Sequence, residues 1–166
     1  MLGGPEIALL LLLVVATTTD LLWGKIYNWL TLPFLLTGLV YRFAFVGLDG
    51  GLAALASIGV AFALFFPLYI VRAVAAGDVK LLMAMGAWAD FSTIYQVAAI
   101  AILVGAAVGL FALLHQKGLK GSARSVVENV RHGEPTRTAT KMAFGPAFFC
   151  AYLIVSVAHY RHWGLL

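Results

Sequence analysis

Residues 75–91 read AAGDVKLLMAMGAWADF, a short apolar segment that begins with an aspartate and a lysine two residues apart. From Val79 onward the segment offers roughly fourteen residues, whereas a helix that crosses a bilayer ordinarily needs about 20. It is therefore either a thin membrane span or a re-entrant helix. The choice between the two fixes the side of the membrane on which the rest of the chain lies.

The composition of the whole chain indicates a membrane protein. Of its 166 residues, 63% are hydrophobic and only 11% are charged, whereas soluble domains carry about 25% charged residues. We therefore expect one membrane-embedded helical domain, residues 1–166, with the lipid bilayer around it. The net charge of +4 does not indicate nucleic-acid binding, because the basic residues lie between apolar runs, where they report orientation. The single cysteine, Cys150, can form neither an internal disulfide nor a Cys-based zinc site.

The other apolar runs predict five longer spans. Each run is long enough for a helix that crosses a bilayer, and they cover about residues 7–23, 29–46, 52–71, 94–114 and 142–160. The connection GLDGG, residues 47–51, has the glycine and aspartate content of a tight turn. Pro67 is expected to kink the last turn of the third span. The loop at residues 115–141 holds most of the basic charge.

The basic residues distinguish the two interpretations of residues 79–91. If this segment crosses the membrane, the chain has six spans with its amino terminus outside, and the basic residues divide nine to two in favour of the inner side. The inner residues are Lys25, Arg72, Lys80, Lys117, Lys120, Arg124, Arg131, Arg137 and Lys141, and the outer residues are Arg42 and Arg161. Such an excess is typical of cytoplasmic loops. We therefore predict an all-α, polytopic protein with about six spans and with residues 115–141 as a basic cytoplasmic loop.

Two of the seven carboxylates, Asp20 and Asp78, lie at the ends of apolar spans. The other five suit turns, helix ends or solvated loops, and these are Glu6, Asp49, Asp90, Glu128 and Glu134. Asp20 lies in the last turn of an apolar span, where it opposes the helix dipole and costs up to about 2.5–3.5 kcal/mol at mid-bilayer. Asp78 has a simpler alternative, because its carboxylate can cap the next helix. The predicted topology nevertheless places Asp20 and Asp78 on the same inner face.

Two carboxylates at one membrane depth suit acid–base hydrolysis. Carboxyl groups within hydrogen-bonding range cannot both ionise cheaply, so one keeps its proton while the other stays charged. The charged group removes a proton from a water between them, and the protonated group donates to the carbonyl oxygen of the scissile peptide. This chemistry requires neither a metal nor a covalent intermediate. Gly77 would let a substrate backbone approach Asp78, and Lys80 could either favour one negative charge on the pair or contact a lipid headgroup.

Three stretches resemble the marked regions of the type IV prepilin peptidases, which are GxGD-type aspartyl proteases of the bacterial inner membrane. The stretches are ATTTDLLWGKIYNWLTLP (16–33), AGDVKLLMAMGAW (76–88) and KMAFGPAFF (141–149). The resemblance implies that Asp20 and Asp78 are the catalytic pair. It also implies that the substrate is a prepilin or pseudopilin precursor, whose basic leader is cut at the cytoplasmic face. The first motif glycine is Ala75 here, which would be strained by about 1 kcal/mol or more if that position requires a positive φ.

The chain resembles the short form of this family. Longer members carry a cytoplasmic domain with paired CxxC zinc motifs, which is associated with methylation of the new pilin amino terminus. Here residues 24–28 alone join the first two spans, and Cys150 has no partner cysteine. The resemblance therefore implies a substrate of the tight-adherence (Flp-type) kind, with no zinc, no other cofactor and no methyltransferase activity. Because the two aspartates lie on different spans, Gly24 and Gly77 are candidate hinges of a movable site.

Two alternatives stay open. The first is a non-enzymatic transporter or assembly subunit in which Asp20 and Asp78 form a proton relay. The second is a metal site, for which a histidine near the aspartates would be expected. All four histidines are distant from both aspartates in the sequence, and they are His115, His132, His159 and His162.

Overall fold

The computed structural model describes residues 3–71, 73–117 and 144–163, and its regular structure there is entirely helical. In chain order the elements are α1 (Gly4–Trp23), α2 (Asn28–Tyr41), the π-helical η1 (Arg42–Val46), α3 (Gly47–Ile70), α4 (Ala76–Trp88), α5 (Phe91–Lys117) and α7 (Phe144–Trp163). The prediction of an all-α fold is confirmed for these residues, and each predicted span corresponds to a helix. Helix α5 continues past the predicted start of the basic loop at residue 115, and residues 118–143 lie outside the described part of the chain.

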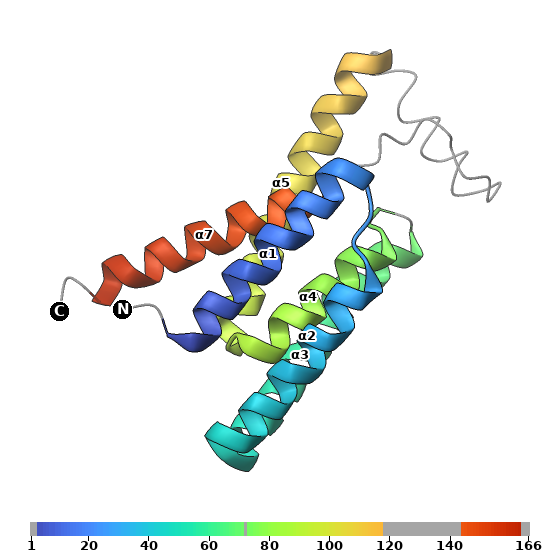
Figure 1. The fold of residues 1–166 in the computed structure, drawn as a ribbon. Coiled ribbons are helices and arrows are strands. Elements are labelled where there is room, and N and C mark those ends of the chain that lie inside the picture. Colours follow the sequence, from blue (N-terminus) through green and yellow to red (C-terminus); the bar gives the residue numbers. More distant parts are fainter. Residues whose placement is uncertain (1–2, 72, 118–143, 164–166) are drawn as a thin grey trace.

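Consecutive helices run in alternating directions (Figure 1). As a result, the carboxyl end of α1 and the amino ends of α4 and α7 lie toward the same end of the bundle. Helix α7 packs against both α1 and α5, which brings the last described helix back to the first. The candidate site lies where these three helix ends meet.

The short helix α4 is the central element. It contacts α1, α2, α3 and α5, and it packs most extensively against α2 and α3. Its 13 residues span about 20 Å, which is less than the ~30 Å hydrocarbon thickness of a bilayer. Most of its side chains are buried, and the largest fully buried ones are Leu81, Leu82 and Met85. The neighbouring helices therefore shield most of this short helix from the surroundings of the bundle.

The connection between α2 and α3 is tighter than predicted. Residues 47–51, which were expected to form a turn, are instead the first turn of α3, so that prediction is wrong. The chain reverses at Gly47, whose φ of +86° lies in the left-handed region that favours glycine. Gly50 and Gly51 serve packing, because an added Cβ would overlap the side chains of Val46 and Phe43 in η1. Glycines that suggested a flexible turn thus allow two helical segments to approach closely.

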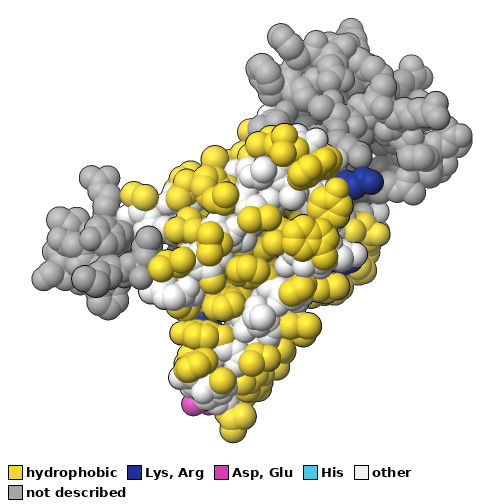
Figure 2. Space-filling view, in the orientation of Figure 1, with side chains coloured by type: hydrophobic (Ala, Val, Ile, Leu, Met, Phe, Trp, Pro, Cys, Tyr) yellow, Lys and Arg dark blue, Asp and Glu magenta, His cyan; other side chains and the backbone are white. Residues whose placement is uncertain are grey.

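The surface of the described helices is strongly apolar. By length and composition, two helical runs could cross a membrane, Gly4–Trp23 and the 43-residue run Asn28–Ile70 that contains α2, η1 and α3. Large hydrophobic side chains are exposed along the helices, including Leu11 (59%), Val40 (66%) and Leu103 (69%). Figure 2 shows hydrophobic side chains over most of the visible face of the described part. A continuous apolar surface of this kind suits lipid contact and would be a liability in water.

Candidate active site

Asp20 is buried at the carboxyl end of α1. The residue is only 7% exposed, and its Oδ2 accepts a hydrogen bond from the backbone N–H of Gly145 at 2.8 Å. The backbone carbonyl of Asp20 accepts the N–H of Gly24 at 2.8 Å. Gly24 ends α1 with φ +61°, a left-handed conformation that favours glycine at this position. The end of α1 and the start of α7 together therefore fix where Asp20 lies.

Asp78 is buried in the first turn of α4 and is 3% exposed. Its Oδ2 accepts the backbone N–H of Ala75 at 2.9 Å, and its own N–H donates to the Ala75 carbonyl at 3.0 Å. These reciprocal bonds form a cap at the start of the helix. The capping role considered from the sequence is thus present. It occupies one oxygen of the carboxylate and is compatible with a second role for the other.

The structure brings Asp20 and Asp78 to neighbouring helix ends. Helices α1 and α4 are in contact, with Asp20 in the last turn of α1 and Asp78 in the first turn of α4. The link that follows α1 lies against the start of α4, because a Cβ added to Gly77 would lie 3.0 Å from Cβ of Ile26 and 3.3 Å from its carbonyl oxygen. Gly77 is therefore approached closely by Ile26 of the same chain, at the position where the sequence suggested an approaching substrate.

Lys80 lies on another side of α4. Residues two apart on an α-helix point about 160° away from each other, so Lys80 and Asp78 do not share a face. The Lys80 ammonium donates to Oδ1 of Asn28 at the start of α2, at 2.9 Å. In this structure Lys80 therefore links α4 to α2, and its hydrogen bond is not to the aspartate pair.

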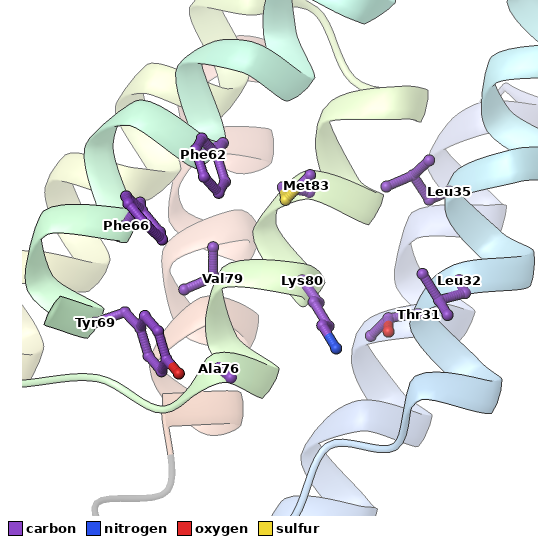
Figure 3. A pocket seen from close by; sticks show the side chains of 10 residues that line it. All are labelled: Thr31, Leu32, Leu35, Phe62, Phe66, Tyr69, Ala76, Val79, Lys80 and Met83. Atoms are coloured by element: carbon purple, nitrogen blue, oxygen red, sulfur yellow. The ribbon is translucent and has the colours of Figure 1, made fainter. Parts of the chain in front are cut away.

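An open, mostly apolar cavity of about 440 Å³ lies between α2, α3 and α4 (Figure 3). The residues that line it are Thr31, Leu32, Leu35, Phe62, Phe66, Tyr69, Ala76, Val79, Lys80 and Met83. The α4 members of this set follow helical spacing on the face that carries Lys80, which faces away from Asp78. The cavity is therefore separate from the aspartate pair.

Ala75 is accommodated without backbone strain. This residue replaces the first glycine of the motif and precedes α4 with φ −84° and ψ 157°. Such an extended conformation is open to any residue, and Ala75 is exposed. The strain that a positive φ would have caused is absent.

Two features beside Asp20 could not be located from the sequence. A Cβ added to Gly145 would lie 3.0 Å from Oδ2 of Asp20, 3.1 Å from its Cβ and 3.2 Å from Cα of Thr17. The hydroxyl of Thr17 is buried without a hydrogen-bond partner among the described residues. The hydroxyls of Thr18 and Thr19 instead donate to the carbonyls of Val14 and Ala16 in their own helix. The only sequence signal for Gly145 was its place in the stretch KMAFGPAFF, which does not indicate a contact with Asp20.

The sequence of residues 7–110 identifies the family of this chain. The model described as the type IV leader peptidase family matches residues 7–110, which include both aspartates. The chain belongs to the type IV leader peptidase family. Searches of curated proteins and of solved structures found no match. Among the described residues, no group of three His, Cys, Asp or Glu side chains could hold a metal ion.

Membership of the leader peptidase family confirms the resemblance found in the sequence and implies a peptidase. Together with the apolar helices, it indicates a membrane protein. Gly145 lies beyond the matched residues, so its contact with Asp20 is a finding of the structure alone.

Proposed function

We propose that this protein is a membrane aspartyl endopeptidase that removes the leader peptide from type IV, Flp-like prepilins or pseudopilins. The observation that carries the proposal is the burial of two carboxylates, Asp20 and Asp78, at the ends of two contacting helices in a leader peptidase chain. Buried carboxylates in an apolar helical protein are costly unless they have a function or a partner. Each accepts one backbone N–H, and among the buried residues of the described part these two are the only ones that carry a carboxyl group.

In the proposed mechanism, the pair activates a water molecule. The ionised aspartate accepts a proton from the water, whose oxygen attacks the carbonyl carbon of the scissile peptide bond. The protonated aspartate donates to the carbonyl oxygen and stabilises the tetrahedral intermediate. Collapse of this intermediate breaks the C–N bond, and a proton passes to the departing amine. The backbone donors of Gly145 and Ala75 each hold one carboxyl oxygen, so they limit the rotation of both aspartates.

The charge distribution supports an orientation. In the predicted six-span topology, nine of the eleven Lys and Arg residues fall on the side that carries Asp20 and Asp78. This excess favours the cytoplasmic face of a bacterial inner membrane, with multiple spans and the site facing the cytoplasm. At the opposite end, Arg42 pairs with Asp90 at 2.8 Å and also donates to the carbonyl of Trp88 at 3.0 Å. One of the two outer basic residues is thus neutralised within the protein.

The proposed activity can be tested with purified protein in liposomes that contain a Flp-type prepilin. We expect the mass of the pilin to fall by the mass of its leader, with one new amino terminus. A proton relay built on the same aspartates, the alternative left open by the sequence, predicts an uncut prepilin together with proton movement across the liposome membrane. An uncut prepilin in the presence of folded protein would refute the peptidase proposal for that class of substrate.

A further inference from the structure

The first turn of α7 reaches the candidate site through Gly145. The buried hydrogen bond from its N–H to Oδ2 of Asp20 joins residues 125 positions apart in the sequence. The first N–H groups of an α-helix have no acceptor within the helix. An aspartate is a favourable partner for them, because the amino end of a helix carries a partial positive charge.

The contact is possible because residue 145 has no side chain. A methyl group at this position would lie within 3.0–3.2 Å of Asp20 and of the Thr17 backbone, so either α7 or the Asp20 carboxyl would have to move. The rest of α7 opposes such a movement. Phe148, Ala151, Tyr152 and Val155 of α7 are buried, and the Phe148 ring lies 5.4 Å from the Phe65 ring of α3.

We propose that Gly145 is a positioning residue, whose backbone N–H fixes the carboxyl of Asp20 in the orientation from which it acts on the catalytic water. This inference rests on the proposed function of Asp20. The packing of α7 holds the donor in place before substrate binds, so the aspartate does not have to be reoriented during the reaction. Gly145 itself is a positioning residue that acts through Asp20.

Cleavage kinetics of Gly145→Ala test the inference. We expect kcat to fall roughly 10–100-fold, because small misplacements of a catalytic group have effects of this size, while KM stays near the wild-type value. Gly86→Ala is the matched control, since its Cβ would lie 3.0 Å from the Ser57 backbone, on the interface between α4 and α3. It imposes similar crowding without contact to Asp20, so its kcat should stay near the wild-type value.

Equal losses of kcat in both variants, or a change confined to KM, would overturn the positioning role. The same experiment separates this role from the proposed function. Wild-type protein that fails to cut a prepilin would contradict the peptidase, whereas active wild-type protein with an equally active Gly145→Ala variant would contradict the positioning role alone.

Hydrogen exchange at the Gly145 amide provides a test that leaves Gly145 unchanged. Because this amide lies in the first turn of α7, its protection should depend on the Asp20 carboxylate. We expect faster exchange in Asp20→Ala and wild-type exchange in Asp78→Ala, which removes the other carboxyl. Equal protection in wild type and Asp20→Ala would overturn the inference, even if Gly145→Ala did not fold.

Discussion

The unpartnered hydroxyl of Thr17 makes a stability prediction that can be worked out from the structure. Replacing Thr17 with valine keeps the branched shape of the side chain and removes a buried hydroxyl that has no partner among the described residues. Leaving such a group unsatisfied costs about 1–3 kcal/mol. The added methyl group contributes up to about 0.8 kcal/mol more through burial. We therefore expect Thr17→Val to raise the free energy of unfolding by about 1–4 kcal/mol.

Thr19→Val is the matched control for this prediction. Thr19 is also buried in α1, at 6% exposure, but its hydroxyl donates to the Ala16 carbonyl at 2.9 Å. The loss of this bond offsets the gain from the added methyl group, so the variant should stay within about 0.5 kcal/mol of wild type.

Thermal unfolding in detergent, followed by circular dichroism, measures both variants. For a chain of this length the gain expected for Thr17→Val corresponds to a rise in Tm of roughly 2–15 °C. A Tm for Thr17→Val at or below that of Thr19→Val would refute the reasoning, because it would show that the Thr17 hydroxyl has a stabilising partner.

Two further predictions concern residues near Asp78. Lys80→Gln should retain kcat for prepilin cleavage, because the Lys80 ammonium bonds Asn28 and points away from the carboxyl pair; a large loss of kcat would show that this lysine acts on the pair during the reaction. Ala75→Gly should leave cleavage and Tm close to wild type, because Ala75 already has an extended backbone and the glycine keeps the N–H that bonds Asp78. A clear gain in kcat on restoring this glycine would show that the alanine constrains the site.

The helices could be predicted because their signals are local, whereas Asp20 and Asp78 could be paired as candidates only through the predicted topology. Long apolar runs determine where helices form in a chain of this composition. Asp20 was identifiable because nothing near it in the sequence accounts for a carboxylate at the end of an apolar helix. That Lys80 does not face Asp78 could also have been predicted, since residues two apart on a helix do not face each other.

The remaining features depend on contacts between distant segments. Gly145 touches Asp20 only because α7 packs beside α1, and no local sequence pattern predicts that contact. Gly50 and Gly51 have the composition of a turn, but their function is to let α3 approach η1. Glycine has several structural uses that look alike in a single sequence.

The most direct test of the central claim is prepilin cleavage by Asp20→Asn and Asp78→Asn, measured beside wild type and the control Asp49→Asn. Asp49 lies exposed in the first turn of α3, so the Asp49→Asn variant should cleave prepilin at the wild-type rate. Each of the other two substitutions keeps the size of the side chain and removes the acid, and each should lower kcat by at least about 100-fold in protein that folds and inserts normally. Cleavage at the wild-type rate by either Asp20→Asn or Asp78→Asn would contradict the two-aspartate site.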